Sequence, residues 1–402
     1  MNTRNALAFI FCTVALDVLA LGVMIPVLPR IVLGFMDGDT AGAAEMFGVF
    51  ATVWALMQFL CSPLLGALSD RFGRRPVILI SCLGLGLDYI FMALAPSLLL
   101  LFVGRVVSGI TSATIGTSFA YIADVTKPDE RAKAFGLVGM AFGLGFVVGP
   151  AIGGLLGGLD PRLPFWVSAA ACLPNAAFGW FVLPESLPPE KRMAFSWKRA
   201  SPVGSLKLLA SQRQLLGLAC VDFLGNLAHQ VLPAVFVLYA GHRYGWGEAT
   251  VGLTLAFVGV CTAVVQGLLI GPIVRRIGAR GAVVAGLLAG ATGMSIYGLA
   301  STGPWFWVGV PVMAFWGIAG PALQDMMTRH VSGCEQRQLQ GATSASRSIA
   351  GLIAPGIFAV LFAWTIDTLP GAAFLLAGGL LAGAALATWF VTARTRPGAR
   401  VP

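Results

Sequence analysis

The feature that most constrains this chain is a succession of apolar runs, each long enough to cross a lipid bilayer. A hydrocarbon core about 30 Å thick needs about 20 apolar residues in a helix, and charged or turn-forming residues separate the runs here. Backbone polar groups in lipid must pair within their own segment, so the runs are expected to be helical. The expected spans are 6–29, 45–68, 77–95, 98–122, 134–158, 163–183, 213–240, 250–272, 281–301, 304–326, 341–364 and 370–391. The sequence therefore predicts an all-α membrane protein with twelve transmembrane helices.

The composition is typical of a membrane-embedded protein. Hydrophobic residues make up 57% of the sequence and charged residues 11%, whereas soluble domains carry about 25% charged residues. The net charge of +9 comes from short basic clusters between the apolar runs, with no aromatic-interleaved patch of the kind that binds nucleic acid. The seven cysteines are scattered without metal-ligand spacing, so we expect no metal site.

The basic residues predict the orientation of the chain. Most of the 26 Lys and Arg residues fall on one side if both termini lie on that side. The opposite side receives Arg30, Arg162 and Arg243, and Arg105 and Arg347 fall inside expected helices. Because loops rich in Lys and Arg stay in the cytoplasm, we expect cytoplasmic termini and a cytoplasmic linker.

An internal repeat divides the chain into two halves. A shift of 205 residues superposes Gly66-x4-Arg71-x-Gly73-x-Arg75 on Gly271-x4-Arg276-x-Gly278-x-Arg280, and it also pairs Asp17 with Asp222 and Pro150 with Pro355. One offset shared by loops and helices indicates duplication. We expect a six-helix half over 1–183, a cytoplasmic linker over 184–212 and a second half over 213–402. Parallel repeats of this kind are typical of transporters whose substrate binds near the midplane between the halves.

Four ionisable residues stand out within the expected spans. They are Asp17, Asp88, Arg105 and Asp222. A charge at the bilayer centre costs at least about 2.5 to 3.5 kcal/mol, so each residue invites a functional hypothesis with a partner. We take all four, together with His229, as candidates for proton coupling.

Asp222, Asn226, His229 and Gln230 share one face of their helix, since they are spaced i, i+4, i+7 and i+8. One interpretation is a polar stripe that lines the substrate cavity, with Asp222 or His229 as proton acceptor. The other is a hydrogen-bond cluster that joins this helix to a neighbour.

Small residues surround Arg105, with Ser108 and Gly109 one turn further on. The guanidinium beside an acid such as Asp17 would stabilise the ionised acid until substrate or a conformational change separates them, which makes a proton switch. A static ion pair is the alternative.

The loop after the second span is a candidate gate. It contains Gly66, Asp70, Arg71, Gly73 and Arg74. Asp70 is expected to accept from backbone amides at a neighbouring helix start or to pair with Arg131, and breaking these contacts would let one half rock against the other. Simple anchoring of the arginines at lipid headgroups is the alternative.

A glycine-rich run lies inside the fifth span. It includes Gly149, Pro150, Gly153 and Gly154. No strand precedes it, so it does not match a nucleotide-binding loop. Glycine here permits close helix contact, and Pro150 removes one backbone donor.

These motifs resemble those of a known family. Gly66-Ala-Leu-Ser-Asp-Arg-Phe-Gly-Arg-Arg-Pro76 is similar to the signature loop of the major facilitator superfamily, and Gly149-Pro-Ala-Ile-Gly-Gly154 to its antiporter motif. Thr13 to Asp17, Met24 to Pro29, Ala55 to Phe59, Asp88-Tyr89 and Pro321 to Gln324 resemble the tetracycline/proton antiporters.

The resemblance implies a major facilitator fold and efflux of a drug in exchange for protons. Asp17, Asp70, Asp88 and Arg105 then take the places of that family's acids and helix 4 arginine. The substrate-binding candidates are Asp17, Gln58, Asn226, His229, Gln230, Gln266 and Gln324.

The second half departs from the family pattern. Gly290 stands where those exporters keep an acid in helix 9, and Thr262 where they keep a histidine in helix 8. Asp222 and His229 are the remaining candidates for proton coupling in this half.

We therefore expect a multi-pass protein of the bacterial inner membrane that exports a tetracycline-like or other amphipathic drug by alternating access. It would need no cofactor beyond the proton gradient, would carry a tetracycline as its magnesium chelate, and would act as a monomer. A symporter that imports a small metabolite and a non-transporting membrane sensor are the alternatives. No nucleophile, cofactor constellation or nucleotide-binding loop indicates an enzyme.

Overall fold

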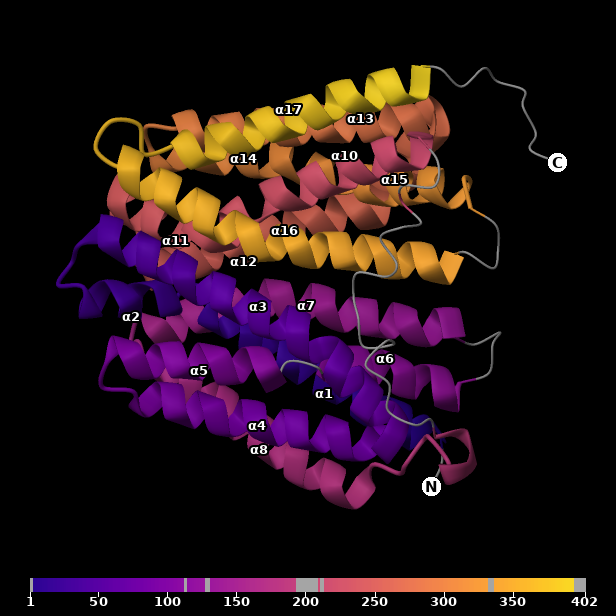
Figure 1. Cartoon of the computed structure of the whole chain (residues 1–402). Coiled ribbons are helices and arrows are strands. Elements are labelled where there is room, and N and C mark those ends of the chain that lie inside the picture. Colours follow the sequence, from indigo (N-terminus) through magenta and orange to yellow (C-terminus); the bar gives the residue numbers. More distant parts are fainter. Residues whose placement is uncertain are drawn as a thin grey trace. The chain divides into compact units, whose positions relative to one another are not determined.

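The fold is helical in all the regular elements that we can describe. A computed structural model describes residues 3–111, 114–126, 131–192, 209, 213–331 and 336–393. The elements are α1 (Thr3–Met24), α2 (Leu28–Phe35), α3 (Thr40–Phe72), α4 (Arg74–Leu94), α5 (Leu98–Thr111), α6 (Thr114–Val125), α7 (Arg131–Gly157), α8 (Leu163–Val182), η1 (Pro189–Lys191), α10 (Arg213–His229), α11 (Val231–Tyr244), α12 (Glu248–Val264), η2 (Val265–Leu269), α13 (Ile270–Leu299), α14 (Gly303–Ala314), η3 (Phe315–Ile318), α15 (Ala319–Thr328), α16 (Gln336–Thr365) and α17 (Ala372–Ala393) (Figure 1).

The apolar helices account for the expected spans. Within the described ranges, 11 helical segments are long and apolar enough to cross a membrane. One of them, Glu248–Leu299, has 52 residues and is broken at Gly278, whose φ of 72° and ψ of 167° are not helical. That segment supplies two spans, so the chain has the twelve that the sequence predicts.

Several spans are interrupted where the sequence suggested continuous helices. The first expected span divides into α1 and α2, because Pro26 has no N–H to donate to the helix. In the second half, α10 ends at His229 and α11 begins at Val231. A π-helical turn at Val265–Leu269 follows α12, and a 3₁₀ turn at Phe315–Ile318 follows α14. Such irregular turns inside helices often mark functional positions.

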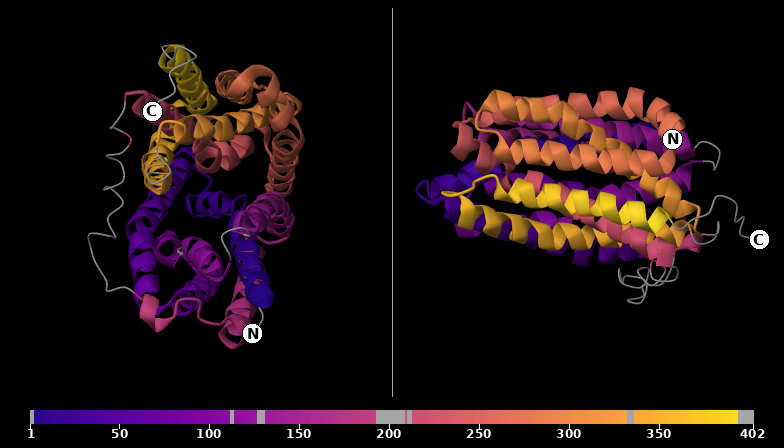
Figure 2. Two further views of the ribbon diagram at one scale, coloured as in Figure 1. Left: turned by 90° about the vertical axis from the view of Figure 1, so that its right-hand side faces the viewer. Right: turned by 90° about the horizontal axis from the view of Figure 1, so that it is seen from above.

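The described chain forms two compact units. One comprises Met1–Ser201 with Ala240–Gly259, and the other comprises Pro202–Tyr239 with Val260–Pro402. The halves expected from the sequence differ from these units in one respect, because Ala240–Gly259 packs with the first unit rather than the second. Within the second unit, α17 lies along α13 and α10 (Figure 2).

Glycines explain why this segment packs in the first unit. A Cβ on Gly154 of α7 would lie 2.8 Å from the Cα of Gly252 in α12, and one on Gly259 would lie 3.1 Å from the Cβ of Val147. Arg30 of α2 donates to the backbone oxygen of Trp246 at the start of this contact. The absence of side chains lets the two helix backbones touch, which is the packing role expected of the glycine-rich run.

The other face of that run packs on α1. A Cβ on Gly149 would lie 2.8 Å from the backbone oxygen of Leu19, and one on Gly153 would lie 2.7 Å from the Cα of Val23. On α1, a Cβ on Gly22 would meet the ring of Pro150 at 2.9 Å. The antiporter motif is therefore a strip of backbone contact with α1 on one side and α12 on the other.

The two repeats share a local conformation. Gly73 has φ 108° and ψ 160°, and Gly278, 205 positions later, has φ 72° and ψ 167°. Two residues after each glycine an arginine reaches the last helix of its own half. Arg75 donates to the backbone oxygen of Trp180 at 2.5 Å, and Arg280 donates to that of Trp389 at 3.1 Å. The repeat found in the sequence is thus a repeat of geometry as well.

Candidate functional site

In the first unit, the arginine of α5 is buried against an aromatic ring, and an acid is buried on the adjacent helix α4. Arg105 is 6% exposed, and its guanidinium carbon lies 5.6 Å from the centre of the Trp54 ring of α3. Asp88 of α4 is 2% exposed. A Cβ on Gly104 would lie 3.3 Å from Asp88 Oδ1, so the small residue lets α4 and α5 approach. The unit therefore buries opposite charges within its spanning helices.

Asp17 belongs to the same unit. It lies in α1 and is 7% exposed. α4, which carries Asp88, packs directly on α5, which carries Arg105. Both Asp17 and Asp88 are therefore candidates for the acid of a switch with Arg105, and the switch between Asp17 and Arg105 stays a prediction.

The same unit contains two further polar positions. One turn before Asp17 on α1, Thr13 is fully buried and accepts a hydrogen bond of 3.1 Å from the side-chain amide of Asn175 in α8. Gln58 is half-buried on α3. Asn175 could not be identified from the sequence, because a single amide in an apolar helix has no pattern around it.

The second unit contains an ion pair within its spanning helices. Arg347 Nη2 of α16 lies 3.7 Å from Asp222 Oδ1 of α10, and the two side chains are 55% and 11% exposed. The side-chain amide of Asn226 donates to the backbone oxygen of Asp222 at 2.7 Å. Asp222 is thus joined to a neighbouring helix, while its arginine partner keeps access to solvent.

Trp316 is the centre of a second group of contacts in this unit. Its ring centre lies 5.6 Å from that of His229, which is exposed at the end of α10. A Cβ on the next residue, Gly317, would lie 2.9 Å from Nε2 of Gln266. His229, Gln266 and Trp316 each sit at one of the three helix interruptions of the second half. Discontinuous helices supply the substrate sites of many transporters.

At Gly290, the position that corresponds to the acid of helix 9 in the related exporters, there is no space for an acidic side chain. A Cβ on Gly290 of α13 would lie 2.9 Å from Cγ of Trp316 and 3.0 Å from Cδ1 of Leu381. The indole therefore occupies the place into which a longer side chain would point. This contact explains why the polar chemistry of this unit lies on α10 and α16 instead.

The remaining glutamines of the candidate set are also in the second unit. A Cβ on Gly351 of α16 would lie 3.1 Å from Nε2 of Gln230, so this amide faces the helix that carries Arg347. Gln324 lies in α15, and its Nε2 is buried with no hydrogen-bond partner among the described residues. Asp222, His229 and these glutamines therefore belong to one unit, separate from Asp17, Asp88 and Gln58.

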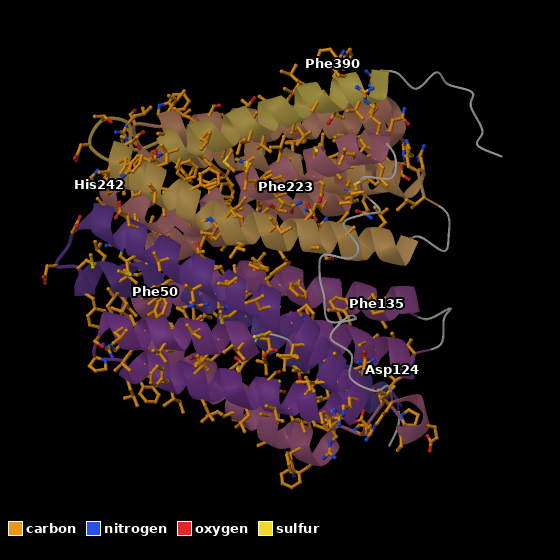
Figure 3. The ribbon with its side chains drawn as sticks, viewed as in Figure 1. Phe50, Asp124, Phe135, Phe223, His242 and Phe390 are labelled. Atoms are coloured by element: carbon orange, nitrogen blue, oxygen red, sulfur yellow. The ribbon has the colours of Figure 1, made fainter. Side chains whose placement is uncertain are left out.

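The signature loop forms a network around Arg74. Its Nη1 lies 2.5 Å from Asp70 Oδ1 and its Nε lies 3.2 Å from Asp124 Oδ2 of α6. The hydroxyl of Ser69 donates to the backbone oxygen of Gly66 at 2.7 Å. Figure 3 places Asp124 at the end of α6. The expected partner Arg131 begins α7, but its side chain lies outside the described part of the chain.

The expectation that Asp70 accepts from backbone amides at a helix start is wrong for α4, because Glu185 is the carboxylate at that helix start. Glu185 Oε1 accepts from the backbone N–H of Arg74 at 2.8 Å, and Oε2 accepts from that of Arg75 at 3.3 Å. These two N–H groups begin α4, where a negative charge is stabilising. Asp70 instead pairs with Arg74 four residues later on the chain, because that side chain is closer.

Comparison with known proteins supports one family. The sequence model of the Major Facilitator Superfamily matches residues 7–355. The class C tetracycline resistance protein of Escherichia coli is 39% identical over 94% of this chain and 95% of its own length, and the class B protein of the same species is 33% identical over 90% and 89%. The solved structure of the nucleoside transporter NupG, 14% identical, aligns with a TM-score of 0.77 over 98% of this chain and 100% of its own, which supports the fold.

The chain is accordingly a multi-pass membrane protein of transporter fold. Its buried acids and arginines lie in spanning helices, its antiporter motif is a backbone contact strip, and its relatives match nearly end to end. It belongs to the Major Facilitator Superfamily and, within it, to the family of the tetracycline resistance proteins.

Proposed function

We propose that this protein exports a tetracycline-like drug across the bacterial inner membrane in exchange for protons, by alternating access. The observation that carries the proposal is an acid and an arginine within the spanning helices of each unit. Asp222 forms an ion pair with Arg347, and Asp88 and Arg105 are both buried on the adjacent helices α4 and α5. Charges in apolar helices are costly and persist where they serve transport. The names of the relatives supply the substrate class.

The coupling uses the acids as proton carriers. A proton that arrives at Asp222 neutralises the carboxylate and removes its ion-pair attraction to Arg347, which joins α10 to α16. A proton at Asp88 removes the negative charge buried on α4 beside α5, the helix that carries Arg105. Asp17 and His229 provide further acceptors in their units.

The proton gradient is sufficient as the energy source. Inward movement of one proton releases about 2.3 kcal/mol per 100 mV, whereas a tenfold gradient of neutral drug costs about 1.4 kcal/mol. The protein then needs no bound cofactor and catalyses no chemical step, and a tetracycline would travel as its magnesium chelate. Both termini lie in the cytoplasm, since the basic loops favour that orientation. The protein works as a monomer.

Drug susceptibility of an efflux-deficient bacterial strain tests the substrate. The panel contains tetracyclines, phenicols, quinolones and cationic dyes. We expect resistance to tetracyclines with the intact chain and its loss with Asp17→Asn or Asp222→Asn. The matched control is Asp37→Asn, an exposed loop acid with a φ of 52° that asparagine also adopts.

Everted membrane vesicles test the coupling. We expect drug uptake when respiration acidifies the vesicle lumen and release of the drug when an ionophore collapses the pH gradient. Uptake that persists without the gradient, or full uptake by both acid variants, would refute proton coupling through these residues. Resistance to other compounds alone would refute the substrate class.

A further inference from the structure

The second unit contains a cavity away from the candidate site residues. It has a volume of about 370 Å³ and lies where α10 begins, α13 restarts after Gly278, and α15 and α17 end. That volume lies within the range of small-ligand sites. Its polar lining comes from Gln214, Arg280, Arg329, His330 and Thr392, and none of the described residues that line it is an Asp or Glu.

The first unit shows what the same place in the repeat normally holds. There the Glu185 carboxylate accepts from the two N–H groups that follow Gly73, and a Cβ on Gly73 would lie 2.6 Å from the carboxyl carbon of Glu185. At Gly278, the equivalent glycine, a Cβ would meet nothing within 4 Å. The second unit therefore keeps the backbone geometry of an anion-capped helix start, and none of its described residues supplies the anion.

The cationic groups of the cavity have capacity for an anion. Arg280 donates through Nη2 to the backbone oxygen of Trp389, and its Nε is buried with no hydrogen-bond partner among the described residues. Nδ1 of His330 lies 2.8 Å from the backbone oxygen of Met326, and Nε2 lies 3.1 Å from Oε1 of Gln214. Asp325 pairs with Arg329 at 2.6 Å and offsets one charge, so the lining still carries a positive excess.

The rest of the cavity wall is apolar and continues to the lipid-facing surface. Leu218, Met326 and Val391 line it. The Arg280 guanidinium lies 4.5 Å from the ring centre of Trp389, which is 56% exposed. Its neighbour Phe390 is 69% exposed and points outward from α17 (Figure 3). A ligand with an anionic head and an apolar tail fits both parts, since arginine and exposed tryptophan are typical of the membrane interface.

We propose that this cavity binds the phosphate of an anionic phospholipid headgroup, with Arg280 and Arg329 as its cationic contacts and the N–H groups after Gly278 as further donors. The acyl chains leave along the exposed aromatic face of α17. The lipid phosphate thereby caps α13 in the second unit as Glu185 caps α4 in the first. A guanidinium is well suited to this role, because it binds phosphate through two parallel hydrogen bonds.

Native mass spectrometry of the full-length protein tests the proposal. The probes are phosphatidylglycerol, phosphatidylcholine and inorganic phosphate. We expect phosphatidylglycerol to bind in preference to phosphatidylcholine. Met326→Glu, which places a carboxylate in the cavity, should weaken phosphatidylglycerol binding about tenfold, as loss of one charge-assisted contact would. The matched neutral variant Met326→Gln should leave binding unchanged.

A second pair of variants distinguishes lipid binding in the cavity from lipid attraction to positive charge elsewhere on the surface. Arg329→Gln removes a cavity cation that is 68% exposed, and Arg275→Gln removes an exposed cation that does not line the cavity. Only the first should weaken phosphatidylglycerol binding. Equal losses in the two variants, equal binding of the two lipids, or unchanged binding by Met326→Glu would each overturn the site.

The source of the phosphate is decided in the same experiment. Millimolar inorganic phosphate should leave phosphatidylglycerol binding intact, since the acyl chains add apolar contact. Binding of inorganic phosphate that displaces the lipid and is lost in Met326→Glu would assign the cavity to a soluble phosphate and overturn the lipid assignment. These readouts measure binding alone, so they hold or fail independently of drug export.

Discussion

Alanine at the two equivalent glycines should have unequal consequences. Gly73 and Gly278 have the same place in the repeat, and both adopt a backbone conformation that is almost exclusive to glycine. We predict that Gly73→Ala destabilises the protein clearly more than Gly278→Ala. The two substitutions add the same methyl group, so their difference reports the surroundings rather than the chemistry of the change.

The magnitude follows from the contacts at each site. Backbone strain costs about 1 to 3 kcal/mol in either variant. At Gly73 the new Cβ would also displace the Glu185 carboxylate, leaving the N–H groups of Arg74 and Arg75 without an acceptor. An unsatisfied buried group costs about 1 to 3 kcal/mol. We therefore expect a loss of about 2 to 6 kcal/mol for Gly73→Ala against about 1 to 3 for Gly278→Ala.

Thermal unfolding of the purified protein in detergent measures the difference. Glu185→Ala completes a double-mutant cycle, because in that background Gly73→Ala has no carboxylate to displace and should cost only the strain. Glu190→Ala, an exposed acid five residues later, is the control for loss of charge. Equal unfolding midpoints for the two glycine variants, or a strictly additive cycle, would refute the reasoning.

Three further substitutions test the packing and charges of the two units. Arg347→Gln should lower the unfolding midpoint more than Asp222→Asn. Arg347→Gln leaves the Asp222 carboxylate, which is 11% exposed, without its partner, whereas Asp222→Asn leaves the Arg347 guanidinium, which is 55% exposed, without its partner. Equal shifts of the midpoint would contradict this prediction. Gly290→Asp should reduce the folded yield, since overpacking costs about 1 to 3 kcal/mol, and adding Trp316→Ala should recover part of it. In Gly252→Ala the new Cβ would lie 2.9 Å from the Cα of Gly154 in α7, so the unfolding midpoint should fall. An unchanged midpoint would refute the backbone contact between α7 and α12.

The fold was predictable because its signals are local or periodic. The length of each apolar run depends only on bilayer thickness, and the shared offset of 205 residues needs no structure to be seen. Boundaries were less predictable. The interruptions at His229 and at Phe315–Ile318 lie beside Pro233 and at Gly317. Prolines also lie inside the continuous helices α3 and α7, so a proline or glycine does not by itself identify a break, and packing against neighbouring helices decides which ones interrupt the helix.

The candidate site was predictable residue by residue but not as pairs. Asp17, Asp88, Arg105 and Asp222 stood out because a charge in an apolar run is conspicuous. The partners of Arg105 and Asp222 did not, since Trp54 and Arg347 come from other helices and sequence spacing says nothing about distance across a bundle.

The sequence by itself determined that the chain spans a membrane with two repeated halves, because hydrophobicity and repetition are properties of the residue order. Only the tertiary structure decided which charges meet. It paired Asp222 with Arg347, filled the space at Gly290 with Trp316, and capped α4 with Glu185, whereas no described residue caps the equivalent helix start after Gly278. Coulomb energy and steric exclusion depend on distances of a few ångströms, and those distances exist only after the helices have packed.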